Sequence, residues 1–264
     1  MKLLLTNCEK CPNAIDKTQK TVIMTYGAKN RREQYGQMPC WCGNIMTETI
    51  KPELENLFET YKEFRQFMTM YHSAIKEVRT KFEILNDDLS MDYDRNPIEM
   101  IKSRIKSPES IVGKLQRKGI PFSIENVVEN INDIAGVRVI CSFVDDIYKV
   151  AEMFVSQDDI NVLEVRDYIK NPKPNGYRSY HMIVEVPVFF AQFRRNMKVE
   201  VQFRTIAMDF WASLEHKMHY KKDIEGSEDI VNRLRECAAV IAMTDLKMQE
   251  INKSITEIRS EHND

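Results

Sequence analysis

The chain has 264 residues, of which 43% are hydrophobic and 30% charged, so it can form one large domain or two small ones around a real core. Its net charge of -2 excludes a protein-wide basic surface for bulk nucleic-acid binding, so an anionic ligand must be met by local clusters. No apolar run is long enough for a membrane span or a signal peptide. We therefore expect a cytoplasmic protein whose six cysteines are thiols or metal ligands.

The first 49 residues differ from the rest of the chain and are expected to form a cysteine-containing extension. They carry two close cysteine pairs, Cys8 with Cys11 and Cys40 with Cys42. Four thiolates can hold a structural zinc ion, although the second pair is one residue shorter than the usual spacing. The alternatives are an appendage with free thiols, or a natural start at Met46 that makes the preceding residues an extension of the gene model.

A long amphipathic segment follows, and Pro52 is expected to open it. Its apolar residues recur at alternating spacings of three and four, which predicts one helix of about 35 residues with a heptad seam. The seam consists of Leu54, Leu57, Tyr61, Phe64, Met68, Tyr71, Ile75, Val78, Phe82 and Leu85. Such a helix can lie across the domain core or contact another subunit, and we favour a helix that does both.

Two helices and a basic cluster are predicted next. Pro97 is expected to start a helix that runs to Arg104, and Ser110 to cap a second helix that Gly119 ends. The basic cluster of this segment consists of Arg104, Lys106, Lys114, Arg117 and Lys118. A basic helix is usually a solvated face, but their concentration in a short segment bounded by turns favours a phosphate site.

A buried strand is predicted within residues 131–143, and the loop that enters it holds Asp133. Gly136 permits a close backbone approach. Arg138 interrupts the apolar run, which is unfavourable unless the arginine meets an anion. The next predicted elements are a helix and a strand, at residues 144–154 and 160–166.

The stretch 165–205 carries the densest set of polar side chains. A loop rich in Pro, Gly and Asn delivers Tyr177 to His181 onto a strand, which a turn near residues 191–196 joins to a second strand. One face of the second strand is apolar. The other face carries three polar side chains, those of Glu200, Gln202 and Arg204. An exposed aromatic ring, two kinds of cation and a carboxylate on one sheet face suit a nucleotide and its metal ion.

Helices are predicted at the end of the chain. Residues 206–220 form one helix, with Phe210, Leu214 and Met218 on one face. The last helix carries a second heptad-like seam through Ile230, Leu234, Cys237, Ile241, Met248, Ile251, Ile255 and Ile258. The predicted architecture is α+β: a mixed sheet of about five strands flanked by helices, with long helices at both ends.

Two carboxylates, Asp133 and Glu200, are placed near the ends of predicted strands. Two carboxylate oxygens, with water and phosphate oxygens completing the coordination, are the usual way in which a protein holds Mg²⁺ beside a nucleotide. Such an ion offsets phosphate charge and orients in-line attack. The alternative is that both carboxylates form ordinary ion pairs, with Arg138 and Arg204.

Four motifs stand out in this part of the chain. They are Asp133-Ile-Ala-Gly-Val-Arg138, Gly176-Tyr-Arg-Ser-Tyr-His181, Val199-Glu-Val-Gln-Phe-Arg-Thr205 and Phe210-Trp-Ala-Ser-Leu-Glu-His216. In order and spacing they resemble the (p)ppGpp synthetase domain of the RelA/SpoT family, and above all its stand-alone small alarmone synthetases. The synthetase domain with its flanking helices is expected to span residues 50–264, with no hydrolase domain.

The resemblance implies a nucleotidyltransferase-like synthetase fold and Mg²⁺-dependent transfer of pyrophosphate from ATP to the 3′-hydroxyl of GTP or GDP. This reaction makes (p)ppGpp in the stringent response and releases AMP. Asp133 and Glu200 would be catalytic and bind Mg²⁺, and Glu200 would also be the base for the 3′-hydroxyl. On the ATP side the resemblance places Arg104, Lys106, Ser110, Lys114, Arg117 and Arg138. On the guanine-nucleotide side it places Tyr177, which would stack on guanine, with His181, Gln202, Arg166 and Lys173. Glu215 and His216 would support this side directly or through hydrogen bonds.

Regulation and partners follow less directly. Glu83, Asn86 and Met100 stand where family members activated by the alarmone carry basic and aromatic residues, which leaves constitutive activity, product activation and another regulator such as single-stranded RNA open. The family's tetramer depends on the flanking helices, so a homotetramer is expected. Two rival functions are a toxic relative that pyrophosphorylates tRNA and an RNA-binding regulator that uses the N-terminal cysteines as a zinc knuckle.

Overall fold

The computed structural model describes residues 45–92, 95–219 and 227–263. The chain divides into two units, Met1–Pro52 and Glu53–Asp264, and the fold described here is that of the second. The predicted zinc ligands lie outside the described residues, so the zinc site stays a prediction; these ligands are Cys8, Cys11, Cys40 and Cys42.

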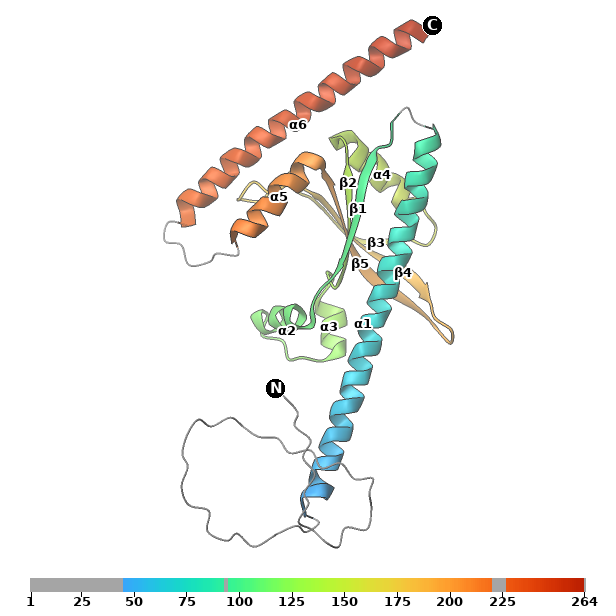
Figure 1. Ribbon diagram of the computed structural model, residues 1–264, viewed down its shortest axis with the longest axis vertical. Helices are drawn as coiled ribbons and strands as arrows, with labels where there is room; N and C mark the ends of the chain where they lie inside the picture. The colour runs from blue at the N-terminus through green and yellow to red at the C-terminus, as the bar shows by residue number, and fades with distance from the viewer. Residues whose placement is uncertain (1–44, 93–94, 220–226, 264) are drawn as a thin grey trace, which may run out of the picture. The chain divides into compact units, whose positions relative to one another are not determined.

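Within these residues the chain forms helices on both sides of one five-stranded sheet (Figure 1). The elements are α1 (Ile45–Asp92), β1 (Ile98–Ile105), α2 (Pro108–Arg117), α3 (Ile124–Asn130), β2 (Ala135–Cys141), α4 (Val144–Val155), β3 (Asn161–Asp167), β4 (Tyr180–Phe189), β5 (Arg194–Thr205), α5 (Ile206–His219) and α6 (Ser227–Asn263). The strand order is β1-β2-β5-β4-β3, with β2 and β5 parallel and the other neighbours antiparallel. The predicted α+β class with a mixed sheet is confirmed. None of the described helices is long and apolar enough to cross a membrane.

One face of the sheet is apolar and forms the core with α1 and α4. Phe82 of α1 stacks on Phe154 of α4 with ring centroids 4.3 Å apart, and meets Phe203 of β5 edge-on at 5.7 Å. All three rings are fully buried, and burying each contributes roughly 1.5–3 kcal/mol. Among the seam residues whose side chains the structure describes, the buried ones are Tyr71, Ile75, Val78 and Phe82. The prediction that this helix lies across the core is therefore confirmed.

Residues 97–104 do not form the predicted helix, because Ile98–Ile105 is the edge strand β1, paired antiparallel with β2. A β-bulge between Ile98 and Met100 shifts the side-chain alternation by one residue. Ile98, Ile101 and Ile105 consequently share the inner face at spacings of three and four, which imitates a helix. Pro97 precedes an edge strand, where its missing N–H is tolerated.

Two other predicted helix starts were wrong. α1 begins at Ile45 and not at Pro52, since a proline removes one backbone donor without always ending a helix. Ser107, and not Ser110, caps α2, and its hydroxyl accepts the backbone N–H of Ser110 at 3.3 Å. Pro108 then occupies the first helical position, for which its fixed φ is suited.

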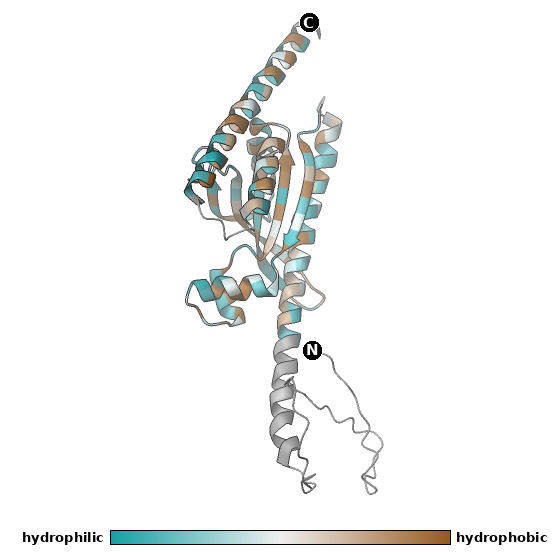
Figure 2. Ribbon diagram, turned by 60° about the vertical axis from the view of Figure 1, so that its left-hand side comes forward, coloured by the Kyte–Doolittle hydropathy of each residue, from teal (hydrophilic) through white to brown (hydrophobic). Residues whose placement is uncertain are grey.

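α5 and α6 pack on each other beside the sheet around a second, small apolar cluster (Figure 1). Trp211 of α5 and Ala238 of α6 are buried in it, and the ring of Tyr177 packs against it. The indole N–H of Trp211 donates to the carbonyl of Leu234 at 3.1 Å. Beyond this cluster, hydrophobic residues continue along the exposed face of α6 (Figure 2).

Asp245 of α6 is a buried carboxylate that holds the start of α5. It accepts a 2.6 Å hydrogen bond from Thr205, whose hydroxyl in turn accepts the N–H of Met208 at 3.1 Å. Burial raises the pKa of Asp245 above its ordinary value of 3.8, and the Thr205 bond only partly opposes this. The unfolded chain therefore ionises first as the pH rises, so the folded protein loses stability from about pH 3.8 upward, and the loss is complete once the pH exceeds the raised pKa.

We expect Asp245→Asn to unfold at a higher temperature than the wild type at neutral pH, because an amide oxygen can still accept from Thr205 without carrying a buried charge. The gain should be about 1.4 kcal/mol for each unit by which the pKa is raised, and should shrink as the pH falls toward 3.8. Thermal unfolding followed by circular dichroism across this pH range measures it. Asp146→Asn is the control, since it breaks a 2.8 Å ion pair with Arg95 and should lower the Tm at neutral pH. A lower Tm for Asp245→Asn would contradict the prediction.

Candidate active site

The sheet face opposite the core carries a row of polar side chains, one from each strand. Cross-strand neighbours link Lys102 of β1, Arg138 of β2, Gln202 of β5, His181 of β4 and Arg166 of β3, in that order. Directly opposed residues point to the same face, so these five side chains lie along one line across the sheet. Of the five, only Lys102 was not among the predicted site residues.

The adjacent row contains Arg104, Gly136 and Glu200, in register on β1, β2 and β5. Because Gly136 has no side chain, a space opens beside Arg104. It is a cavity of about 220 Å³ lined by Lys102, Ser103, Arg104, Gly136, Val137, Arg138 and Gln202. Two arginines predicted for the ATP side, Arg104 and Arg138, thus border the same cavity.

Gly136→Val is expected to fill this cavity while leaving the fold intact. A Cβ at Gly136 would lie 3.6 Å from Cγ of Arg104, which is an ordinary contact, and the methyl groups of valine would extend beyond it. We expect the KM for ATP to rise about tenfold or more, which corresponds to about 1.4 kcal/mol of lost binding free energy. The KM for the guanine nucleotide should change little. Gly136→Ala is the matched variant and should change the KM for ATP only a few-fold. Steady-state kinetics with each substrate varied separately checks this, and equal effects on both substrates would contradict it.

Asp133 lies just before β2 and binds both lysines of the predicted ATP side. Lys106 Nζ is 2.7 Å from one carboxylate oxygen and Lys114 Nζ is 2.9 Å from the other. Burial raises the pKa of Asp133, but the hydrogen bonds and charges of the two lysines outweigh it and hold the pKa below its usual value. Asp133 is therefore ionised at neutral pH, and the alternative prediction that it pairs with an arginine was wrong.

Glu200 faces the other half of the site. Gln202 Nε2 donates to Glu200 at 2.8 Å, and His181 Nδ1 lies 3.6 Å away. Burial raises the pKa of Glu200, but these polar neighbours outweigh it and lower the pKa overall. Burial also lowers the pKa of His181, so at neutral pH this histidine is uncharged beside an ionised carboxylate. The predicted alternative of a Glu200–Arg204 pair was wrong, because Arg204 pairs with Asp209.

Asp133 and Glu200 have the chemistry to hold a hard divalent ion. Both carboxylates are ionised, and the charge of Asp133 raises the pKa of Glu200, so the two lie close enough to interact. Within the described part of the chain, no group of three or more His, Cys, Asp or Glu side chains could hold a metal. Two carboxylates that leave the other positions to phosphate and water are typical of Mg²⁺.

Tyr177 lies at the edge of this face, where the loop 168–179 meets the sheet. Its hydroxyl is 2.8 Å from His181 Nε2 and accepts from Arg204 Nη2 at 2.8 Å. Lys173 Nζ lies 4.9 Å from the centre of its ring. Gly176 has a φ of 89°, and a Cβ there would lie 2.5 Å from Cβ of Ala238. The loop that carries Tyr177 is therefore seated directly on α6.

The remaining predicted residues are exposed or bind other groups. Arg166 is held by Glu164 through bonds of 2.6 and 2.9 Å. Arg117 and Ser110 lie exposed on α2. Lys118, counted in the basic cluster, instead donates to the carbonyl of Asn130 at 2.9 Å. Of the supporting pair, Glu215 accepts from Asn175 at 3.3 Å and His216 is exposed.

Asp209, in the first turn of α5, is the carboxylate that sequence reasoning missed. One of its oxygens accepts from Arg138 at 3.1 Å and from Arg204 at 3.0 Å, and the other accepts from Lys102 at 3.0 Å. Burial raises its pKa, but the bond from Lys102 and the two arginine charges lower it overall. The available signal was an acidic residue in the first turn of a helix that follows a polar strand.

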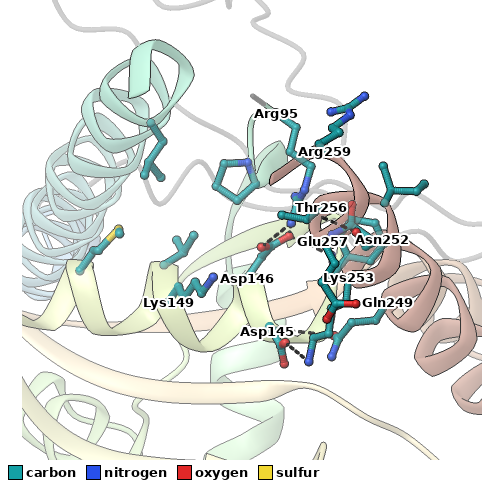
Figure 3. Close-up of a pocket in the computed structure, with 16 residues that line it drawn as sticks. Arg95, Asp145, Asp146, Lys149, Gln249, Asn252, Lys253, Thr256, Glu257 and Arg259 are labelled. Atoms are coloured by element: carbon teal, nitrogen blue, oxygen red, sulfur yellow. Dashed lines mark hydrogen bonds and ion pairs between the residues drawn. The ribbon is translucent and has the colours of Figure 1, made fainter. Parts of the chain in front are cut away.

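A larger cavity of about 680 Å³ lies elsewhere, between the C-terminal half of α6 and the first turns of α4 (Figure 3). Its lining carries four cations and three carboxylates, so its charges nearly balance. Arg95 binds Asp146 at 2.8 Å and Lys253 binds Asp145 at 2.8 Å (Figure 3). On the polar sheet face, by contrast, cations outnumber the three carboxylates. We therefore place the candidate active site on the sheet face, where anionic substrates are needed to balance the charge.

Proteins of known function resemble this chain over most of its length. A protein-family model for the region found in RelA / SpoT proteins matches residues 103–225. The chain is 43% identical over 202 residues to GTP pyrophosphokinase YwaC of Bacillus subtilis, across 76% of this chain and 96% of that protein. It is 36% identical over 199 residues to GTP pyrophosphokinase YjbM of the same organism, across 75% of this chain and 93% of that protein.

Solved structures of small alarmone synthetases also match this chain. The small alarmone synthetase 1 of Bacillus subtilis, bound to its product pppGpp, matches with a TM-score of 0.68 at 36% identity, covering 74% of this chain and 99% of that one. The small alarmone synthetase 2 of Bacillus subtilis matches with a TM-score of 0.66 at 44% identity, covering 73% and 99%. The predicted synthetase fold is confirmed, and the chain belongs to the RelA/SpoT family, where it is similar to the small alarmone synthetases.

Proposed function

We propose that this protein is a GTP pyrophosphokinase, which transfers pyrophosphate from ATP to the ribose 3′-hydroxyl of GTP or GDP and so makes (p)ppGpp. The observation that carries the proposal is the polar sheet face. Two ionised carboxylates meet cations or polar groups there, Asp133 with Lys106 and Lys114 and Glu200 with Gln202 and His181, so two phosphorylated substrates can meet on this face. The relatives YwaC and YjbM are GTP pyrophosphokinases, which supports the same activity here.

The donor ATP is assigned to the side of Asp133. Lys106 and Lys114 neutralise this carboxylate in the structure. As flexible point charges they can turn to phosphate oxygens when a triphosphate enters. Arg104 and Arg138 border the cavity of about 220 Å³, and a planar guanidinium can stack on a purine base. Mg²⁺ held by Asp133 and Glu200 would neutralise part of the phosphate charge.

The acceptor nucleotide is assigned to the side of Tyr177. The face of this ring is occupied by Lys173, which also lies 4.7 Å from the ring of Tyr168. A guanine base that stacks on Tyr177 would displace Lys173. The released ammonium group could then meet the phosphates of the same nucleotide. His181 and Gln202, next to Glu200, would line the ribose end of this subsite.

Glu200 is assigned as the base. In the reaction the 3′-oxygen of the acceptor forms a bond to the β-phosphorus of ATP, and the bond from that phosphorus to the oxygen of the α-phosphate breaks, so AMP leaves. The proton of the 3′-hydroxyl passes to the carboxylate of Glu200. Because the pKa of Glu200 is lowered, this carboxylate is ionised and able to accept a proton at neutral pH.

Transfer of label tests the proposal directly. ATP labelled in its terminal phosphate is incubated with the protein, Mg²⁺ and GTP, GDP or tRNA in turn, and the products are separated. We expect label in the guanine nucleotide and equimolar AMP. Label found only in tRNA would overturn the assigned acceptor, and label in none of the three would overturn the activity.

Tyr177→Ala should weaken the guanine nucleotide far more than ATP. Stacking of a base on an aromatic ring is worth about 1–3 kcal/mol, so the KM for GTP or GDP should rise about tenfold or more. Tyr177→Phe is the matched variant: it keeps the ring but loses the hydroxyl contacts to His181 and Arg204. We expect it to lie closer to the wild type. Equal losses for ATP and the guanine nucleotide with the alanine variant would argue against stacking.

Association and location extend the same proposal. We expect a homotetramer, because the flanking helices present exposed hydrophobic residues. On α5 these are Ile206, Phe210, Leu214 and Met218, and on α6 they include Val240, Met243, Ile251, Ile255 and Ile258. The particle mass in solution measures this, and a monomer would contradict it. We also propose that the protein is cytoplasmic and that an alarmone or single-stranded RNA regulates it.

A further inference from the structure

Asp209 binds three cations that come from three neighbouring strands. Lys102 is on β1, Arg138 on β2 and Arg204 on β5, and each lies 3.0 or 3.1 Å from a carboxylate oxygen of Asp209. Asp209 is buried, with 8% of its surface exposed. It stands in the first turn of α5, whose start is fixed by the hydroxyl of Thr205. The carboxylate is thus held in place by the helix, and the cations are arranged around it.

The charges of this cluster do not balance. One carboxylate faces three cations, so Arg138 and Arg204 repel each other, and the charge of Arg204 lowers the pKa of Arg138. Asp209 offsets this repulsion because both guanidinium groups bond to the same oxygen. Nε of Arg204 is buried and has no hydrogen-bond partner among the described residues. The cluster therefore keeps a net positive charge.

The two arginines belong to different halves of the site. Arg138 borders the cavity assigned to ATP. Arg204 donates to the hydroxyl of Tyr177, the residue assigned to guanine, at 2.8 Å. The oxygen shared by these arginines is the only atom of Asp209 that either of them binds in the described structure. A displacement of Asp209 would therefore move both halves together.

We propose that Asp209 is a positioning residue that sets the donor-side Arg138 and the acceptor-side Arg204 at the same time. This inference rests on the proposed function. Asp209 touches neither the reacting atoms nor the two metal-binding carboxylates, and acts through the arginines it holds. Both guanidinium groups are oriented by one oxygen of Asp209, unlike the flexible lysines bound by Asp133, so removing its charge loses their orientation and weakens the binding of both nucleotides by similar factors. A residue that served one subsite alone would affect one nucleotide.

Three variants of the full chain test the proposal. Asp209→Asn removes the charge with little change in shape, and Asp209→Glu keeps the charge on a longer side chain. Asp146→Asn is the matched control: Asp146 is also buried, lies in the first turn of α4 and binds an arginine, Arg95, at 2.8 and 2.9 Å. For each variant, initial rates are measured with ATP and GDP varied independently in the presence of Mg²⁺. Calorimetry gives the Kd of ATP and of GDP separately.

We expect Asp209→Asn to raise the KM and Kd for both nucleotides about tenfold, the size of one lost charge-assisted hydrogen bond, with a smaller change in kcat. Asp209→Glu should be intermediate for both nucleotides. Asp146→Asn should lower the Tm but leave both KM values within about twofold, because Arg95 is outside the site.

The outcomes separate the two proposals. An Asp209→Asn protein in which only one nucleotide is weakened, or neither, overturns the role of Asp209 while wild-type activity stands. If that variant does not fold, Asp209→Glu decides, since unchanged KM values for both nucleotides would overturn the role as well. A wild-type protein that transfers no label to GTP or GDP overturns the proposed function instead. In that case the Kd values of ATP and GDP for the variants still judge whether Asp209 sets both subsites.

Discussion

Glu200→Gln is expected to lower turnover about 10³-fold while the protein still folds and still binds ATP and the guanine nucleotide. General-base catalysis contributes about 10²–10⁴-fold, and this variant also loses a charged metal ligand. The glutamine amide has nearly the shape of the carboxylate and can still contact Gln202, so the hydrogen bonds of the row are kept. Since Glu200 is 15% exposed at its side chain, little rearrangement of solvent is needed. The loss should therefore appear in kcat rather than in the Kd of either nucleotide.

Single-turnover rates and nucleotide Kd values measure this effect separately. Glu185→Gln is the matched control, since Glu185 lies on the neighbouring strand β4 and accepts only a 3.4 Å bond from Asn196. It should leave turnover unchanged. Wild-type turnover in Glu200→Gln would remove both the base and the metal assignments. A loss confined to nucleotide binding would remove the base assignment alone.

Asp133→Asn is expected to lower turnover by about 10²–10³-fold and to raise the Mg²⁺ concentration needed for half-maximal activity. The change removes one of two charged oxygen ligands for the ion. It also leaves Lys106 and Lys114 without their carboxylate, so ATP phosphates should bind no more weakly, and the KM for ATP should fall or stay constant. This combination differs from that of an ordinary structural defect, which weakens binding and turnover together.

Titration of activity with Mg²⁺ at saturating nucleotide checks the prediction. Asp159→Asn provides the control, because Asp159 also binds a lysine, Lys81, at 2.8 Å but lies at the far side of the core. It should shift neither the Mg²⁺ requirement nor the KM for ATP. An Asp133→Asn protein with an unchanged Mg²⁺ requirement would show that this carboxylate does not bind the ion.

Sequence reasoning was most successful where local pattern decides the structure. The alternation of β5 placed Glu200 and Gln202 on the polar face, and the apolar run with Arg138 located β2. The strand β1 could not be predicted in the same way. Its bulge lets three isoleucines imitate a helix, and only pairing with β2 shows otherwise. A local pattern cannot report a partner strand that lies about 35 residues farther along the chain.

The same reasoning explains why the partners of the carboxylates were mistaken. Arg138 and Arg204 each lie a few residues from one of the predicted carboxylates in the sequence, and their charge suits an ion pair with it. Both arginines instead pair with Asp209. These ion pairs depend on the direction in which α5 leaves the end of β5, because this direction places Asp209 over β2 and β5. The roles of individual site residues stay predictions for a related reason, since the substrates define which cation meets which phosphate.

The row from Lys102 to Arg166 has a consequence for how such an enzyme can change. Adjacent strands are about 4.8 Å apart, so this row across five strands is roughly 19 Å long, and its length is set by backbone hydrogen bonds rather than by side chains. In the proposed arrangement the sheet would fix the separation of the donor and acceptor nucleotides. A one-residue insertion inside a strand would turn its part of the row to the opposite face. Changes in acceptor preference are therefore easiest in the loop that carries Tyr177, where length and composition can vary without changing the spacing of the side chains in the row.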